Sequence, residues 1–355
     1  MKIRQQAMAV LVVVLVTAWT LTGCGGKEAG WSEKNVMVLG THSQIRVHSE
    51  DRESGAETVD RAFQRVREIE DRMSTWEPDS QIARINRQAG REPVQVTDDV
   101  LFMIEEGLLQ YELTNGLFHI GLGTLTELWG LSSDQPRIPE PDVIERTVER
   151  IDIQTIHISG NQVKILQPGT AIDLGGIAKG YGVDESARIL RDNGISSGII
   201  NFGGDVYALG EKPDGTPWYV GIKEPVPGTN ELLGRLGVKN LAVVTSGDYE
   251  RYVADDDSDT RFHHILDPRT GMPAVNELVS TTIIADTALE ADIVSTAVFV
   301  MGLESGYRYT LELPNVEGIF VTGDNEVYLT PGVINLFELR NSDYLLMGEL
   351  EVEDE

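Results

Sequence analysis

An acid, a glycine turn and the start of a helix follow one another in residues 173–184, which read DLGGIAKGYGVD. The apolar residues before Asp173 predict a short strand, and a helical pattern begins near Ile177. Glycines let the backbone approach a ligand closely, and the N-terminus of a helix offers free N–H groups to an anion. The spacing fits neither G-x-G-x-x-G nor G-x-x-x-x-G-K-[ST]. The segment therefore predicts a site for a phosphate or a metal-bound phosphate.

Asp292 and Thr296 are four residues apart in a helix that we predict over residues 285–301. This spacing places both side chains on one face of the helix. A carboxylate and a hydroxyl are hard oxygen ligands for Mg²⁺ or Ca²⁺, and Mg²⁺ usually takes further ligands from water and substrate phosphates. The pair fits a metal site. The alternative is structural: Asp292 would cap a helix or form an ion pair, and Thr296 would bond back to its own helix.

Two histidines, His263 and His264, directly precede the sequence ILDPRTG. The pairs Asp267-Pro268 and Thr270-Gly271 predict a rigid turn after them. A histidine held in place before such a turn can act as a general base near neutral pH. Either ring could instead only stabilise the turn through a hydrogen bond.

The N-terminal residues have the pattern of an export signal. Lys2 and Arg4 form a basic region, and an apolar run over residues 7–18 follows them. This run is shorter than the about 20 apolar residues of a membrane-spanning helix. Cys24, the only cysteine, follows a small residue and resembles the lipidated cysteine of bacterial lipoproteins. We therefore predict a signal peptide over residues 1–23 and a lipid anchor on Cys24. The protein would then sit on the outer side of the cytoplasmic membrane; an uncleaved anchor or an ordinary signal is the alternative.

The chain is strongly acidic, with 29 Lys and Arg against 57 Asp and Glu and a formal net charge of −28. Such a surface argues against nucleic acid or anionic lipid as a binding partner. It also favours a bound cation wherever an anionic ligand must be held. Solubility or adaptation to salt would explain most of the charge by itself.

Strands are mixed with helices through both local and crossover connections, and no internal repeat is present. This mixture favours an α+β fold with mixed sheets in a single large domain over a doubly wound parallel sheet. We expect a tether at residues 24–34, the domain at residues 35–340 and an acidic tail at residues 341–355. The helical patterns cover residues 58–73, 100–111, 177–191 and 285–301, and hairpins are expected around Gly160-Asn161 and around a Gly-Asp-Asn turn near residue 324.

Together, six segments resemble the ApbE family of FAD:protein FMN transferases, over residues 36–329. In chain order they are GTHSQIRV, MSTWEPDSQIARIN, DLGGIAKGYGVD, TSGDYERY, HHILDPRTG and ADIVSTA. The resemblance implies a T-fold-like arrangement within the α+β class. It also implies that FAD is the substrate and that an acceptor flavoprotein with a Ser or Thr hydroxyl is the partner.

The resemblance assigns roles residue by residue. It implies that Asp292, Thr296 and the main-chain oxygen of Gly176 bind the metal, taken as Mg²⁺ with Ca²⁺ or Mn²⁺ possible, and that His264 is the base. The flavin contacts that it implies are Leu39, Trp76, Leu128, Trp129, Gly130, Asp173, Lys179 and Ile265. By their chemistry alone, Lys179 could be a solvated helix residue and Trp76 a core or interface aromatic.

The segment GLFHIGLGTLTELWGL departs from the family pattern. His119 stands where the family has an acid, Gly121 where it has a threonine and Thr124 where it has a proline. We interpret His119 as a structural histidine.

The implied reaction is metal-dependent transfer of FMN from FAD to a partner hydroxyl, with AMP released. Two alternatives are a metal-dependent FAD pyrophosphatase, with water as the acceptor, and a non-catalytic lipoprotein that binds FAD.

Overall fold

The computed structural model describes residues 28–131, 136–254 and 260–352. The predicted signal peptide, Cys24 and the last three residues of the predicted tail lie outside these ranges. Within them, no helix combines the length and the apolar character that crossing a membrane requires.

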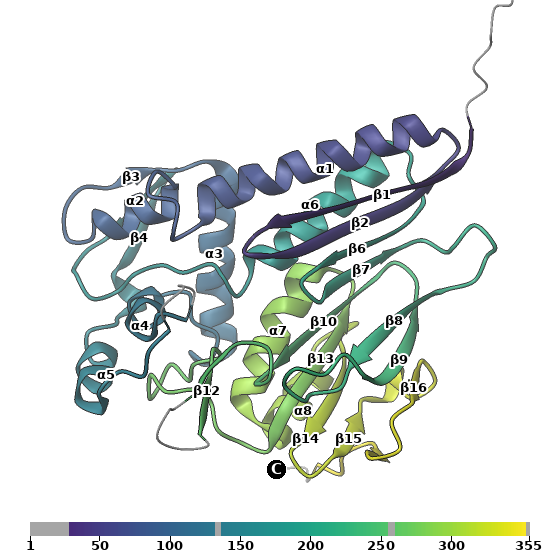
Figure 1. Ribbon diagram of the computed structural model, residues 1–355. Helices are drawn as coiled ribbons and strands as arrows, with labels where there is room; N and C mark the ends of the chain where they lie inside the picture. Colours follow the sequence, from purple (N-terminus) through teal and green to yellow (C-terminus); the bar gives the residue numbers. More distant parts are fainter. Residues whose placement is uncertain (1–27, 132–135, 255–259, 353–355) are drawn as a thin grey trace, which may run out of the picture.

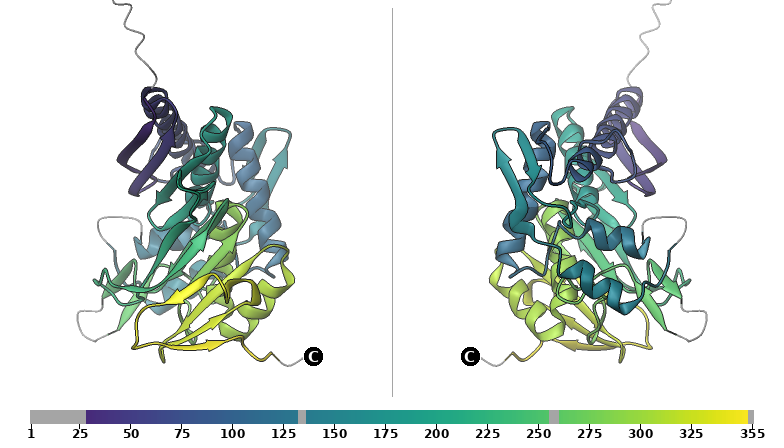
Figure 2. Two further views of the ribbon diagram at one scale, coloured as in Figure 1. Left: turned by 90° about the vertical axis from the view of Figure 1, so that its right-hand side faces the viewer. Right: turned by 90° about the vertical axis from the view of Figure 1, so that its left-hand side faces the viewer.

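One large sheet forms the centre of the described structure (Figure 1), with strands in the order β1-β2-β6-β7-β10-β13-β14-β15-β17. Neighbouring strands are antiparallel except β15 and β17, which are parallel. The strands are β1 (Gly30–Val38), β2 (Thr41–Ser49), β6 (Ser197–Phe202), β7 (Asp205–Leu209), β10 (Leu241–Gly247), β13 (Leu278–Ala285), β14 (Glu317–Thr322), β15 (Glu326–Leu329) and β17 (Leu345–Gly348). Figure 2 shows the first and last strands at opposite ends of the molecule.

Both faces of this sheet are buried, because successive side chains of a strand point to opposite faces. On β10, Val244 belongs to a core under the helices, whereas Val243 belongs to a core on the other face. Phe320 and Ile319 divide in the same way on β14. The second face is covered by a three-stranded sheet of β8 (Trp218–Lys223), β9 (Leu232–Val238) and β16 (Phe337–Leu339).

Helices cover the first face of the sheet. On α1 (Arg52–Met73) the residues Val59, Phe63, Val66 and Ile69 are almost fully buried, as their helical spacing predicts. Each such side chain contributes about 1.5–3 kcal/mol on full burial. The other helices on this face are α6 (Ala178–Asp192), α7 (Ala288–Met301) and α8 (Leu303–Glu312).

The chain between α1 and α6 forms a second core beside the main sheet (Figure 1). This stretch of chain contains a small sheet of β3 (Val94–Gln95), β4 (Ile156–Ser159) and β5 (Gln162–Ile165). It also contains α2 (Gln81–Arg87), α3 (Asp98–Leu113), α4 (Gly123–Trp129), α5 (Pro141–Val148) and the 3-10 turn Ile153–Thr155. A further 3-10 turn, Pro331–Val333, follows β15, and a hairpin of β11 (Tyr252–Ala254) and β12 (Arg261–His263) extends from the end of β10.

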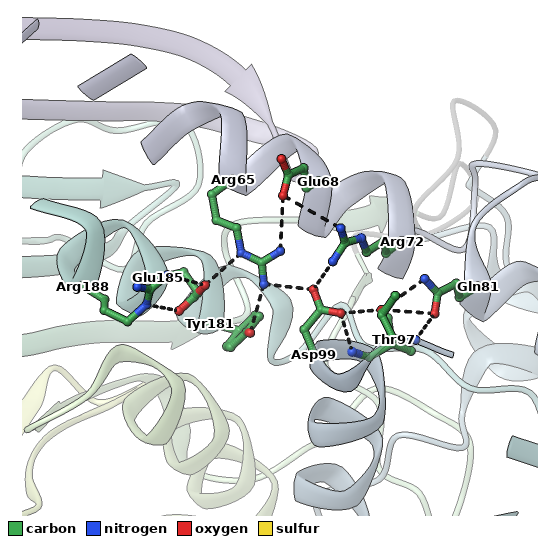
Figure 3. Close-up of polar contacts among 10 residues, drawn as sticks. Arg65, Glu68, Arg72, Gln81, Thr97, Asp99, Tyr181, Glu185 and Arg188 are labelled. Atoms are coloured by element: carbon green, nitrogen blue, oxygen red, sulfur yellow. Dashed lines mark hydrogen bonds and ion pairs between the residues drawn. The ribbon is translucent and has the colours of Figure 1, made fainter. Parts of the chain in front are cut away.

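A cluster of ion pairs joins α1, α3 and α6 (Figure 3). Arg65 of α1 donates to Asp99 at 2.9 Å and to Glu185 at 2.8 Å, and Arg72 donates to Asp99 at 2.7 Å. Burial would raise the pKa of Asp99, but the hydrogen bonds from Thr97 and Arg65 lower it below 3.8. The cluster therefore fixes the second core against the helices of the main sheet.

The α+β class, the four helical segments and both hairpins are confirmed. The domain extends further than we predicted at both ends. β1 begins at Gly30, so residues 30–34, which we assigned to the tether, form the edge of the sheet. β17 lies within the predicted tail and pairs with β15. Alternating side chains give β1 its strand character, whereas β17 has only four residues, which directly precede the acidic end of the chain.

Candidate active site

Two tight glycine turns lie at one end of the main sheet. The β1–β2 hairpin turns through Leu39 and Gly40, with φ of 53° and 65°, and the β6–β7 hairpin turns through Gly203 and Gly204, with φ of 64° and 104°. A left-handed leucine is strained. The Glu70 carboxylate of α1 accepts from the N–H groups of Leu39 and Gly40, and burial raises the pKa of Glu70. This contact holds the strained turn in place.

The segment before Asp173 is not the strand that we predicted. Ala171 forms only an isolated bridge to Leu122. The chain is held by side-chain contacts, since the Asn86 amide donates to the Ile172 carbonyl at 2.8 Å and accepts from the Ile172 N–H at 2.7 Å. The Asp173 carboxylate then accepts from the Gly175 N–H at 2.8 Å. An asparagine 86 residues away thus supplies the bonds that a neighbouring strand would give.

Lys179 lies between two buried carboxylates. Its ammonium nitrogen is 2.6 Å from Oδ2 of Asp205 and 3.3 Å from Oδ1 of Asp292, and both acids are less than 4% exposed. Burial would lower the pKa of Lys179, but the charges of Asp205 and Asp292 outweigh burial and raise it. The lysine is therefore charged, and it is not the solvated helix residue of the structural alternative.

Helices α6 and α7 are joined where this cluster lies. The Gly180 N–H donates to Oδ2 of Asp292 at 3.1 Å. A Cβ atom on Gly180 would lie 2.4 Å from the carbonyl oxygen of Ala288, so only glycine permits this approach. Asp184 accepts from the N–H groups of Ala288 and Leu289 at 2.8 and 2.9 Å, and burial raises its pKa to about 6. Asp184 thus caps α7 from the neighbouring helix.

The hydroxyl of Thr296 faces the same space as Asp292, one turn further along α7. Ser246 of β10 lies 3.4 Å from Oγ1 of Thr296 and 2.9 Å from Oγ of Ser295. Thr296 therefore has a side-chain partner outside its own helix, in contrast to the structural alternative of a bond back to its own turn.

The two histidines have different surroundings. Both ring nitrogens of His263 are bonded, Nε2 to the Ala274 carbonyl at 2.7 Å and Nδ1 to the Ile265 N–H at 3.3 Å, so this ring holds the turn. Among the described residues, the His264 ring has a hydrogen-bond partner on Nδ1 alone, 3.3 Å from the Arg251 carbonyl. A carbonyl can only accept, so Nδ1 carries the proton and the Nε2 lone pair is free. Burial and the charge of Arg251 lower the pKa of His264 to about 3, which keeps the ring neutral.

Residues of the segment 173–179, of β10 and of α7, together with His264, line one cavity of about 220 Å³. Predicted site residues in its wall are Asp173, Gly176, Lys179, His264, Ile265, Asp292 and Thr296. A second cavity of about 310 Å³ contains Leu39 and Trp76 and shares Asp173, Gly175, Lys179 and Arg251 with the first. The structure therefore brings together residues from five of the six sequence segments, and the first two segments add the second cavity. Trp76 is 52% exposed, which excludes a core role for it.

The three residues Leu128, Trp129 and Gly130 line neither cavity. Trp129 is fully buried in a small core with Leu125, and its indole N–H donates to the Gly271 carbonyl at 2.9 Å. Its position couples α4 to the turn after His264 rather than to a ligand. The wall of the first cavity is instead formed by Leu122, Thr126 and Leu131 of the same segment.

His119 also lines the first cavity. Its Nδ1 accepts from the Gly121 N–H at 2.9 Å, and its ring packs edge-on against Tyr111. Burial lowers the pKa of His119 to about 4, so the ring is neutral. The bond to Gly121 fits the structural role that we predicted, while Nε2 remains a donor beside the cavity.

The cavity offers oxygen ligands rather than a complete metal cage. Among the described residues, no group of three or more His, Cys, Asp or Glu side chains could hold a metal ion. Asp292, Thr296 and the Gly176 carbonyl supply one charge and three hard oxygens, which suits an ion that takes its remaining ligands from phosphate or water. Asp205 and Asp292 together carry one more negative charge than Lys179 neutralises. The residues therefore fit a divalent cation bound together with an anionic substrate.

Our reading of the sequence missed Asp205 and Arg251. The signal for Asp205 was present: the sequence NFGGD ends a strand in two glycines and an acid, and a two-residue glycine turn places the next side chain beside the turn. Arg251 lies inside the segment TSGDYERY, but no spacing rule separates it from a surface arginine.

Fold and site define an α+β protein with a polar cavity that combines oxygen ligands for a cation with a neutral, half-free histidine. The sequence profile of the ApbE family matches residues 39–320. This chain belongs to the ApbE family, and the resemblance noted in its sequence is confirmed.

Relatives with known names cover most of the chain. A protein from Treponema pallidum (strain Nichols), named FAD:protein FMN transferase, is 30% identical over 342 residues, which are 91% of this chain and 93% of the relative. A protein of the same name from Klebsiella pneumoniae (strain 342) is 32% identical over 298 residues, or 83% and 90% of the two chains.

Solved structures agree with the fold. The ApbE protein of Thermotoga maritima superimposes with a TM-score of 0.77 at 31% identity, covering 85% of this chain and 98% of that chain. The flavin transferase ApbE of Vibrio cholerae gives a TM-score of 0.75 at 27% identity, covering 87% and 100%.

Proposed function

We propose that this protein is an FAD:protein FMN transferase that moves FMN from FAD to a Ser or Thr hydroxyl of a partner flavoprotein. The observation that carries the proposal is the convergence of Asp173, Lys179, His264, Asp292 and Thr296 on one cavity. The name of a relative that spans nine-tenths of the chain supports the same reaction.

Different residues of the cavity would bind the phosphates, hold the cation and accept the proton in this reaction. Lys179 and the N–H groups of the glycine turn lie where they can hold the pyrophosphate of FAD. Asp292, Thr296 and the Gly176 carbonyl would hold a divalent cation, which supplies positive charge to the phosphate oxygens when it is bound. His264 offers its free Nε2 to the proton of the attacking hydroxyl.

In the proposed step the hydroxyl oxygen of the partner forms a bond to the FMN-side phosphorus of FAD. The bond from that phosphorus to the oxygen that bridges to the AMP phosphate breaks, and AMP leaves with the bridging oxygen. The hydroxyl proton passes to Nε2 of His264. FMN remains on the partner as a phosphoester, and no oxidant or reductant is required.

The test combines purified protein, FAD, Mg²⁺ and a flavoprotein acceptor with a Ser or Thr site. Fluorescent flavin that stays on the acceptor in a denaturing gel, with AMP in the supernatant, is the expected result. Free FMN and AMP in the absence of acceptor would instead indicate a pyrophosphatase. FAD that survives intact with metal and acceptor present would contradict both activities and indicate a protein that only binds FAD.

For the cation we propose Mg²⁺, with Ca²⁺ and Mn²⁺ as substitutes. Removal of divalent ions by a chelator should abolish labelling, and addition of Mg²⁺ should restore it. The variant Asp292→Asn should shift the Mg²⁺ titration to higher concentrations. An unchanged titration would remove Asp292 from the cation site.

Leu39 and Trp76 are our proposed contacts for the isoalloxazine ring, because they line the cavity that adjoins the phosphate site. An exposed tryptophan can stack on a flat ring. Quenching of flavin and tryptophan fluorescence on FAD binding should decrease in Trp76→Leu. Equal quenching in the two proteins would place the flavin elsewhere.

We further propose that the chain is exported and anchored through a lipid on Cys24, on the outer side of the cytoplasmic membrane. The basic, apolar and cysteine pattern of the first 24 residues supports this. Labelled palmitate should enter the wild-type protein and not Cys24→Ser, and the variant should leave the membrane fraction. Equal labelling of the two would exclude Cys24.

A further inference from the structure

The Lys179 ammonium has contacts with two acids from different elements. Asp292 belongs to α7 and is one of the proposed cation ligands, whereas Asp205 is the first residue of β7. The bond to Asp205 is the shorter one, at 2.6 Å against 3.3 Å. Asp205 is 2% exposed and does not line the cavity, so it is available to the lysine and not to a substrate.

The contact between Lys179 and Asp292 conflicts with a cation at Asp292. The ammonium occupies lone pairs of the only carboxylate among the proposed cation ligands. A divalent ion on that carboxylate would also repel the ammonium, and such repulsion is strong where water is scarce. Tight cation binding therefore requires another group that holds the ammonium away from Asp292.

A rigid turn positions Asp205 to hold the Lys179 ammonium away from Asp292. Gly203 and Gly204 have positive φ and form the two-residue turn between β6 and β7, and the Asn201 side chain accepts from the Gly204 N–H at 2.9 Å. Phe202 and Asp205 are paired residues at the ends of these strands. The carboxylate is therefore fixed by the sheet and does not depend on α6 or α7.

We propose that Asp205 is a positioning residue: it retains the Lys179 ammonium and so leaves Asp292 free for the divalent cation. This inference rests on the proposed function, because it assumes that a cation binds at Asp292. Asp205 itself touches neither substrate nor cation. The alternative is that Asp205 only neutralises a buried charge and stabilises the fold.

Binding of Mn²⁺ to the FAD-free protein tests the inference without any turnover, since electron paramagnetic resonance counts the free ion. In Asp205→Asn, Asp292 is the one carboxylate among the described residues that stays within ion-pair distance of the ammonium. We expect Mn²⁺ affinity to fall about tenfold, the effect of about 1.4 kcal/mol. In Lys179→Met no ammonium competes, and affinity should rise by a similar factor. The double variant should bind Mn²⁺ at least as tightly as the wild type.

The matched control is Asp60→Asn, which removes the carboxylate of another lysine–aspartate pair, with Lys34 at 2.5 Å on the surface. It should leave Mn²⁺ affinity unchanged. Thermal melts of all variants report on folding separately.

The outcomes are distinct. A wild-type protein that binds no Mn²⁺ either without or with FAD would contradict the cation site, and this inference with it. If the wild type binds Mn²⁺ only with FAD present, the same variants are compared with FAD bound. Unchanged affinity in Asp205→Asn, with a wild-type protein that does bind, would overturn only the role of Asp205. Weak binding that persists in the double variant would show that Asp205 supports the fold instead. If Asp205→Asn does not fold, Lys179→Met decides, because affinity no higher than wild type would refute the competition.

Discussion

Gly180→Ala tests whether the close contact of α6 with α7 builds the site. The added Cβ atom would lie 2.4 Å from the Ala288 carbonyl oxygen and 2.8 Å from Cα of Leu289. Both are backbone atoms, so no side-chain rotation can relieve the clash. The helices must separate, and the bond from the Gly180 N–H to Asp292, now 3.1 Å, must lengthen.

The size of the effect follows from three contributions. Alanine gains at most about 1 kcal/mol over glycine from helix propensity. Overpacking in a tight contact costs about 1–3 kcal/mol. Loss of a hydrogen bond to a buried carboxylate costs about 1.5–3 kcal/mol. The net expectation is a loss of about 3 kcal/mol in the free energy of unfolding, or a melting temperature lower by roughly 4–5 °C in a domain of this size.

The assay is denaturant unfolding of Gly180→Ala beside Gly182→Ala, two residues along the same helix. A Cβ atom on Gly182 would meet the tip of the Leu39 side chain at 2.9 Å, and that side chain can move. The control should therefore stay within about 1 kcal/mol of the wild type. If Gly180→Ala is as stable as its control, the two helices are not locked by this glycine and the reasoning is refuted.

Four further predictions concern other contacts. His264→Gln should lower kcat by about 10²–10⁴-fold with unchanged FAD affinity. Since burial lowers the pKa of His264 from 6.5 to about 3, log kcat/KM of the native enzyme should stay level between about pH 5 and pH 8; an acid limb near 6.5 would contradict this. Trp129→Phe leaves the Gly271 carbonyl without its donor and should cost about 1–3 kcal/mol in denaturant unfolding; no loss would mean that the indole bond is not needed. Asp99→Asn removes the negative charge that pairs with Arg65 and Arg72 and one of the two acceptor oxygens, and should cost about 2 kcal/mol at neutral pH. The folded pKa of Asp99 lies below 3.8, so this stability should disappear as the pH falls through that lower value, and a loss that persists in acid would refute the ionic origin.

Helical periodicity predicted the elements well, because each long helix buries one face. Val59, Phe63 and Val66 are spaced so that they lie on the face of α1 that packs on the core. The prediction of a strand before Asp173 was wrong, because burial of apolar residues does not by itself identify the element that they belong to. Ile172 is buried in the second core, and its backbone N–H and C=O bond to the Asn86 side chain and not to a neighbouring strand. No local pattern distinguishes this from burial in a sheet.

The candidate site was predictable where a motif carries its own geometry. The four-residue spacing of Asp292 and Thr296 places both on one face of α7, and both line the cavity. The contacts of Trp129 could not be predicted in this way, because an aromatic residue in a motif can either bind a ligand or stabilise a turn. Its hydrogen bond to Gly271, 142 residues away, is a tertiary contact that spacing cannot reveal.

The charge of the cavity gives an argument for a cation that is independent of any single ligand. The first cavity is lined by the cations Lys179 and Arg251 and by the acids Asp173, Glu250 and Asp292, a formal sum of 2 − 3 = −1 before Asp205 behind the lysine is counted. A substrate pyrophosphate would add further negative charge. Charge of one sign is costly to concentrate where water is scarce. A divalent ion at Asp292 would offset this cost, and by reciprocal linkage FAD and the ion should each raise the affinity of the other.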